Sequence, residues 1–341
     1  MRIMYGVQST GNGHINRSRE LLRELRKKGL DVDVVFSGRD PAKLWDVDDF
    51  KPYKAFHGLS FVVRDGKIRH FETALKQNIP RFIGEILKLD VGPYDIVITD
   101  FEPVSAWAAI LAGKKRLGIG HQYSFFYNVP VKGFGIIDKI IMRTFAPANI
   151  KIGLHWDSFG NPILPPLIKK MSLPQNISKG KILVYLAHEK LEDIKSMLEP
   201  FNNNDFFIYY SINEPYDDKN IHMRPFSRTA FLQDLHDCEG VICNAGFELP
   251  SEAIQLGKKI LVKPILGQFE QQSNALAIEK LELGMQMPEL DKQKLGEWLK
   301  SSQKRHLSFP DVAAALADWI ANGDWKSLPA LSKKLWNQVS D

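Results

Sequence analysis

The strongest constraint on the fold is a strand-then-helix alternation that occurs twice along the chain. In the first half, short apolar stretches rich in β-branched residues alternate with amphipathic segments: "MRIMYGV" from Met1, "DVDVVFS" from Asp31, "YDIVITD" from Tyr94 and "KRLGIGH" from Lys115. This alternation is typical of a parallel sheet whose strands are connected by helices. We therefore predict an α/β fold.

The same alternation restarts after a break. Residues 156–181 contain four prolines, which disfavour regular structure and predict a linker. A second series then begins with "KILVYLAHE" and continues through "DFFIYYS", "IHMRPFS", "CEGVICNAG" and "KKILVKP". We predict these boundaries: an N-terminal domain at 1–155, a linker at 156–180, a C-terminal domain at 181–311, and C-terminal helices at 312–341 that cross back to the N-terminal domain.

Length and composition agree with two globular domains. A chain of 341 residues exceeds one average core, and its 44% hydrophobic and 25% charged residues are ordinary for a globular protein. The spacing of Cys238 and Cys243 suits neither a disulfide framework nor a complete metal site, which favours a reducing compartment. The chain shows no signal-peptide pattern and no stretch near the ~20 apolar residues of a membrane span. We expect a cytoplasmic protein.

The charge distribution indicates which kinds of partner the chain can bind. Residues 1–150 carry 23 Lys and Arg against 16 Asp and Glu, an excess too mild and scattered to predict nucleic-acid binding. Residues 123–151 mix aromatic and aliphatic side chains with Lys132, Lys139 and Arg143. This segment either contacts an anionic membrane surface at the inner face of the membrane, or packs on the core with its lysines in water. The sequence leaves both interpretations open.

The stretch "TGNGHIN" places His14 at the turn between the first predicted strand and the first predicted helix. The helix is indicated by Leu21, Leu22 and Leu25 at helical spacing and by Gly29 as its cap. Ligands of open parallel sheets bind outside the carboxyl ends of the strands. We therefore expect a site between the two domains, formed by loops at six positions: His14, Asp100 and His121 on one side, and His188, Phe226 and Asn244 on the other.

The segment from Val241 to Gly284 is the most informative of the second half. After its first strand, Ala245, Gly246 and Phe247 bring backbone N–H groups to the start of a helix, whose partial positive charge can hold a diphosphate without a metal ion. Glu252 lies on that helix, where a carboxylate can accept hydrogen bonds from both hydroxyls of a ribose. The alternative is a solvated helix carboxylate.

This segment resembles the nucleotide-sugar motif of GT-B glycosyltransferases, in particular the lipid II-forming UDP-N-acetylglucosamine transferases. The resemblance covers nearly the whole chain and is clearest at residues 1–29 and 224–284. It implies two Rossmann-like domains with parallel sheets facing across a cleft, an acceptor-binding domain at 1–155 and a nucleotide-sugar-binding domain at 181–311. It also implies a donor site in which the helix-start amides hold the diphosphate, Glu252 binds the ribose and other residues complete the contacts: Gly13, Phe226 beside the uracil, Asn244, and Glu270 with Gln271 at the donor sugar.

His188 occupies the place of a glycine-rich phosphate turn in these enzymes, and it is either a phosphate contact or an ordinary turn residue. The family's first glycine-rich loop carries a histidine, which implies that His14 is the general base. Asp100 would hydrogen-bond its ring, unless Asp100 instead caps the next helix; Glu102 is a second candidate for that partner. His121 and Gln122, with Asn12, would face the acceptor, although His121 and Gln122 can equally hold loop backbone together.

Three functions follow as alternatives. The first is inverting transfer of a sugar, with N-acetylglucosamine favoured by resemblance, from a UDP-sugar to a glycan or lipid-linked acceptor of a cell-envelope polysaccharide. This reaction is expected to need no metal and no cofactor other than the donor substrate. The second is hydrolysis of a UDP-sugar, because certain nonulosonic acid-pathway hydrolases share the Gly-x-Gly-His-x-x-Arg pattern that Arg17 completes here. The third is a nucleotide-sugar sensor without turnover.

Overall fold

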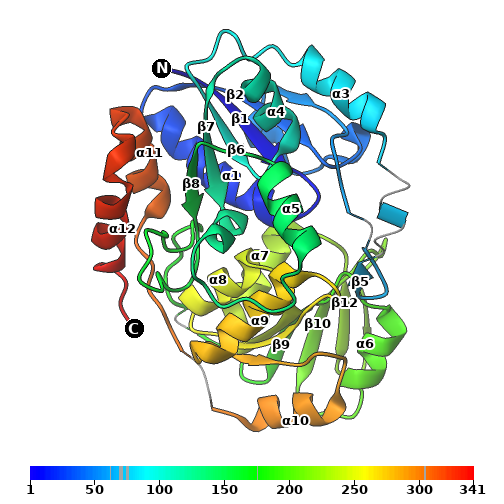
Figure 1. Ribbon diagram of the computed structural model, residues 1–341. Helices are drawn as coiled ribbons and strands as arrows, with labels where there is room; N and C mark the ends of the chain where they lie inside the picture. The colour runs from blue at the N-terminus through cyan, green and yellow to red at the C-terminus, as the bar shows by residue number, and fades with distance from the viewer. Residues whose placement is uncertain (62, 69–71, 74–76, 175, 303–304) are drawn as a thin grey trace.

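Two parallel sheets, one in each half of the chain, organise the structure (Figure 1). The computed structural model describes residues 1–61, 63–68, 72–73, 77–174, 176–302 and 305–341. The first sheet and its helices form the N-terminal lobe, and the second sheet and its helices form the C-terminal lobe. The predicted α/β fold is therefore confirmed.

The N-terminal lobe has a six-stranded sheet in which all neighbours are parallel. Its spatial order β3-β2-β1-β6-β7-β8 runs outward in both directions from β1 and β6, so the connections diverge between these two strands. The strands are β1 (Arg2–Gln8), β2 (Asp31–Ser37), β3 (Tyr53–Ala55), β6 (Ile96–Asp100), β7 (Lys115–Gly120) and β8 (Ile150–Gly153). Such a divergence leaves a crevice at the carboxyl ends of the two central strands, where ligands bind in open α/β sheets.

Helices cover this sheet. They are α1 (Asn12–Lys27), α3 (Ile79–Lys88), α4 (Pro103–Leu111) and α5 (Ile136–Thr144), together with a 3₁₀ segment, η3 (His121–Phe126). Leu21, Leu22 and Leu25 are buried on one face of α1, and Gly29 has φ +72°, as predicted from their spacing. A short hairpin of β4 (Val63–Arg64) and β5 (Lys67–Ile68) projects toward the C-terminal lobe.

The C-terminal lobe repeats the arrangement with seven strands in the order β11-β12-β10-β9-β13-β14-β15. All pairs are parallel except β11 with β12, which is antiparallel. The strands are β9 (Lys181–Tyr185), β10 (Asp205–Tyr209), β11 (Tyr216–Asp218), β12 (Ile221–Arg224), β13 (Gly240–Asn244), β14 (Lys259–Lys263) and β15 (Met285–Gln286). Here the connections diverge between β9 and β13, which places a second crevice at their carboxyl ends.

The helices of the second half divide between the two lobes. Among the residues that the structure describes, those that accompany the C-terminal sheet are α6 (Leu191–Leu198), α7 (Arg228–Asp237), α8 (Glu248–Gln255), α9 (Phe269–Lys280) and α10 (Lys292–Lys300). The last two, α11 (Val312–Asn322) and α12 (Leu328–Trp336), lie beside the N-terminal lobe (Figure 1). Lys28 forms an ion pair with Asp318 at 2.6 Å, and Ser332 and the Trp336 indole N–H both donate to the Ile163 carbonyl.

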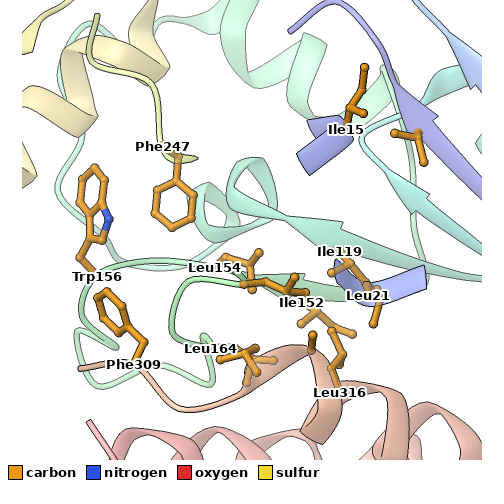
Figure 2. Packing of buried hydrophobic residues seen from close by; sticks show 14 of the residues in the cluster. Ile15, Leu21, Ile119, Ile152, Leu154, Trp156, Leu164, Phe247, Phe309 and Leu316 are labelled. Atoms are coloured by element: carbon orange, nitrogen blue, oxygen red, sulfur yellow. The ribbon is translucent and has the colours of Figure 1, made fainter. Parts of the chain in front are cut away.

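One apolar core runs through both lobes. Figure 2 shows Leu316 of α11 near Leu21 of α1 and Ile152 of β8, and Phe247 of the C-terminal lobe near Trp156. The rings of Phe247 and Trp156 are 5.0 Å apart, and the Trp156 indole N–H donates to Ser251 Oγ at 2.7 Å. Trp156 therefore holds the start of α8 in two ways, by ring packing on Phe247 and by a buried hydrogen bond to Ser251.

Candidate active site

A cleft of about 320 Å³ lies between the lobes where the two crevices face each other. Its N-terminal wall is the first turn of α1, and its C-terminal wall is formed by the turns that follow β9 and β13 and by the start of α9. Of the residues predicted for the site, most line this cleft: Asn12, Gly13, His14, Gln122, His188, Phe226, Asn244, Gly246, Phe247, Glu252, Glu270 and Gln271.

His14 and Asp100 meet at the divergence point of the N-terminal sheet. Val7 of β1 pairs with Asp100 of β6, so the two strands end side by side, and α1 begins directly above them. His14 Nδ1 lies 2.9 Å from Asp100 Oδ1. Asp100 is fully buried, whereas part of the His14 side chain remains exposed to the cleft. An imidazole so oriented by a buried carboxylate can take a proton at its other nitrogen.

Glu102, the second candidate for this partner, has a different position. Its carboxylate accepts the backbone N–H groups of Val104 and Ser105 at 2.6 and 2.7 Å and thereby caps α4. The N-cap of α4 is therefore Glu102, and the alternative in which Asp100 caps this helix is wrong.

Arg17 is a site residue whose contacts the sequence did not reveal. It lies one turn after His14 and donates to both oxygens of Asp100, at 2.9 and 2.6 Å. Burial alone would raise the pKa of Asp100, but the charges of Arg17 and His14 lower it to about 2. Asp100 is therefore ionised over the whole physiological range. The i, i+3 spacing of His14 and Arg17 on a helix was the available signal.

Arg17 also reaches across the cleft and forms an ion pair with Glu248, the first residue of α8. Burial raises the pKa of Glu248 to about 7, although the neighbouring Arg17 opposes this shift. The closeness of α1 and α8 requires Gly13, because a Cβ there would lie 2.8 Å from Glu248 Cγ. Asn12, one residue earlier, accepts from Arg39 at 3.4 Å.

The turn between β13 and α8 differs in part from the expected cradle of free amides. The Ala245 N–H donates to the Lys263 carbonyl at 3.2 Å, and the Gly246 N–H to the Asn244 carbonyl at 2.8 Å. Helix α8 has no side-chain N-cap, so its first-turn amides have no side-chain acceptor and are the groups of this turn that an anion could contact. A Cβ at Gly246 would meet no protein atom within 4 Å, so this residue borders open space.

Glu252 lies one turn after Glu248 on the same face of α8 and lines the cleft. Burial, and then the proximity of Glu248, raise the pKa of Glu252 to about 8. A protonated carboxyl can donate one hydrogen bond and accept others, which suits a vicinal diol.

The far end of the cleft holds an aromatic surface. Phe226 is 43% exposed, and its ring lies edge-on to Tyr185 at 6.1 Å. His188 lines the cleft at the turn after β9, where its carbonyl accepts the Gly66 N–H of the β4–β5 hairpin at 2.7 Å. An exposed ring beside a polar turn is suited to stacking on a planar base.

Glu270 and Gln271 at the start of α9 have different roles in the fold. Glu270 accepts from Gln122 Nε2 at 3.1 Å across the lobe boundary. Gln271 Oε1 accepts the Ile265 N–H at 3.0 Å and so supports the loop before α9. Both residues still border the cleft.

His121 does not lie where an acceptor-binding residue is expected. Its side chain is fully buried, its Nδ1 contacts the Leu154 carbonyl at 2.8 Å, and its Nε2 contacts Asn274 Oδ1 at 2.6 Å. The ring stacks on Phe247 with a centroid distance of 4.1 Å. The alternative, a polar strand-end residue that holds backbone together, is the arrangement present in the structure.

Comparisons with known proteins place this geometry in a family. The family model for glycosyl transferase family 1 matches residues 1–119 and 158–302. A comparison with curated proteins finds no match. Similar solved structures include the glycosyltransferase SnogD from Streptomyces nogalater, at 15% identity over 99% of each chain with a TM-score of 0.56.

Two further structures have known ligands. VinC in complex with dTDP has 12% identity over 99% of this chain and 98% of its own, with a TM-score of 0.54. The rhamnosyltransferase SpnG with spinosyn aglycone has 12% identity over 98% of this chain and 97% of its own, with a TM-score of 0.58. At such identities the likeness concerns the fold. Because the family model matches more than half of the chain, this protein belongs to glycosyl transferase family 1 and is a glycosyltransferase with the GT-B fold.

Proposed function

We propose that this glycosyltransferase inverts the anomeric centre as it transfers a sugar from a UDP-sugar to an acceptor hydroxyl. The observation that carries the proposal is the position of the His14–Asp100 pair on one wall of a cleft whose other wall includes the start of α8. A base and an anion-binding helix start on opposite walls are the two parts that direct displacement requires.

The reaction is a single displacement. His14 Nε2 takes the proton of the acceptor hydroxyl while Nδ1–H donates to Asp100, which stabilises the resulting imidazolium. The acceptor oxygen forms its bond to the anomeric carbon as the bond from that carbon to the diphosphate breaks. The leaving diphosphate keeps the electron pair, and its charge is stabilised by the first-turn amides and dipole of α8, without a metal ion.

Each part of the donor is proposed to contact its own residues of the cleft. Phe226 stacks on the base, Glu252 binds the ribose hydroxyls, Asn244 and the α8 start hold the diphosphate, and Glu270 with Gln271 binds the sugar. Uracil and N-acetylglucosamine are proposed from the resemblance to the lipid II-forming transferases. The dTDP complex of VinC supports a nucleoside diphosphate donor in this fold.

The acceptor is proposed to be a glycan or a lipid-linked sugar at the inner face of the membrane. Within the residues that the structure describes, no helix has the length and hydropathy to span a bilayer. Helix α5 exposes Ile136, Ile137 and Ile140, between 56% and 77%, beside Lys139 and Arg143. Exposed isoleucines with flanking cations suit the interface of an anionic bilayer. Co-sedimentation with phosphatidylglycerol vesicles, and its loss when the three isoleucines are changed to serine, tests this contact.

Hydrolysis of the UDP-sugar remains the second candidate, because Arg17 completes the motif shared with the nonulosonic acid-pathway hydrolases and lies beside His14 at 3.0 Å. In that reaction His14 activates water. A sensor without turnover is the third candidate.

Calorimetric titration with UDP, dTDP, ADP and GDP tests the donor site, and we expect UDP to bind most tightly. UDP-sugars are then incubated with and without acceptors. Free sugar released stoichiometrically without acceptor would favour hydrolysis, and no consumption with any donor and acceptor would favour the sensor. His14→Ala is expected to bind UDP as the wild type does and to lose 10²- to 10⁴-fold in turnover, about the contribution of a general base. Full turnover in this variant would contradict the proposed mechanism.

A further inference from the structure

His121 is the first residue of η3 in the N-terminal lobe, yet its contacts lead directly to the turn proposed to hold the donor diphosphate. Its ring lies parallel to that of Phe247, with an interplanar angle of 4°. Its Nε2 contacts Asn274 Oδ1, and the amide nitrogen of Asn274 donates to the Ala245 carbonyl at 3.0 Å. His121 therefore contacts Phe247 at one end of the Ala245–Phe247 turn and is linked to Ala245 at the other end through Asn274.

The hydrogen-bond partners determine how many protons this ring needs. The Leu154 carbonyl at Nδ1 can only accept. Asn274 must also present its oxygen to Nε2, because rotating the amide by half a turn would bring that oxygen against the Ala245 carbonyl. Both ring nitrogens thus face acceptors, at 2.8 and 2.6 Å, and both contacts are hydrogen bonds only when both nitrogens carry a proton.

Burial acts against that second proton. The ring is fully buried, which lowers the pKa of His121, although Glu270 and the two hydrogen bonds oppose the shift. The other charged or titratable groups that face it are Arg17, which disfavours the charge, and His155, whose ring is 5.2 Å away. The ring is therefore poised between a neutral form with one unsatisfied contact and a charged form with both contacts satisfied.

A diphosphate at the α8 start would change this balance, because it adds negative charge close to Phe247, the residue on which the His121 ring stacks. We propose that His121 takes up a proton from water when the donor nucleotide binds, and that the imidazolium then fixes the diphosphate turn through Asn274 and Phe247. The inference rests on the proposed function and adds a proton linkage to the same site. His121 is a positioning residue that acts through the turn and not by touching the donor.

The test is calorimetric titration of the full-length protein with UDP at one pH in PIPES and in Tris. The dependence of the observed enthalpy on buffer ionisation gives the number of protons taken up. We expect His121→Gln to take up fewer protons than the wild type, by up to one per UDP. The UDP affinity of the wild type should fall as the pH rises, because binding takes up a proton. This fall should be smaller in His121→Gln. His155→Gln is the matched control, because His155 is equally buried but accepts the Trp156 N–H, and it should keep the wild-type uptake.

A second measurement does not depend on the variant folding. Long-range ¹⁵N–¹H spectra of the wild type should show the His121 nitrogens both protonated in the UDP complex. Equal uptake in the wild type and His121→Gln, or a neutral ring in the complex, would overturn the inference while the proposed function stands. No binding of any nucleoside diphosphate to the wild type would overturn both.

Discussion

Replacing Glu252 with glutamine should make the protein less sensitive to alkaline pH. Glu252 is 92% buried in α8, and its pKa is raised from 4.5 to about 8, so the folded protein holds a proton that the unfolded chain releases. The contribution of the Glu252 carboxyl to the free energy of unfolding is fully present below pH 4.5 and is lost as the pH rises toward 8. At about 1.4 kcal/mol per pH unit, levelling off near the folded pKa, the loss between pH 6 and pH 8 is roughly 2 kcal/mol.

Urea unfolding followed by circular dichroism at pH 6, 7 and 8 measures this loss directly. Glu252→Gln should lack about 2 kcal/mol of the wild-type decline, because an amide does not ionise. Glu297→Gln removes one carboxylate from the exposed face of α10 and serves as the control. Parallel pH profiles for the wild type and Glu252→Gln would refute the reasoning and indicate that the cleft hydrates this carboxylate.

Three further predictions concern neighbouring residues. Arg17→Gln removes the cation that lowers the pKa of Asp100 to about 2, so this pKa, followed through the carboxyl ¹³C signal of Asp100 in an NMR titration, should rise by about one unit or more; an unchanged pKa would show that Arg17 does not keep this carboxylate ionised. Gly13→Ala places a Cβ 2.8 Å from Glu248 Cγ, and thermal unfolding should show a loss of about 1–3 kcal/mol; unchanged stability would mean that the lobes separate freely. Burial holds the pKa of His155 well below 6.5, so acid favours the unfolded chain, and between pH 7 and pH 5.5 the wild type should lose about 1 kcal/mol that His155→Gln retains.

Elements that depend on local periodicity were predictable from the sequence. The strand-helix alternation gave the parallel sheets, and the leucines of α1 with Gly29 gave that helix and its end. The contact between His14 and Asp100 could also be predicted, because the carboxyl ends of adjacent parallel strands lie at one edge of a sheet. The N-cap of α4 was ambiguous, because Asp100 and Glu102 both precede it and both residue types can accept backbone N–H groups.

The individual contacts between side chains of the two lobes were not predictable. The Arg17–Glu248 pair joins residues 231 positions apart, and neither position carries a local signal for the other. The burial of His121 against Phe247 likewise follows from docking of η3 on the second lobe. The occupied amides of Ala245 and Gly246 reflect turn geometry that "NAGF" does not specify, since glycine permits several turn types.

The packing of α11 has a consequence for how the chain is made. Leu316 completes an apolar layer with Leu21 and Ile152 (Figure 2), so segments near the start and near the end of the chain share one interior. During synthesis, the residues up to and including α11 (Val312–Asn322) must leave the ribosome before this apolar layer of the first lobe can close. Until then, the apolar surface beside α1 that Leu316 covers stays accessible to chaperones. A chain truncated before residue 312 would leave this surface exposed permanently.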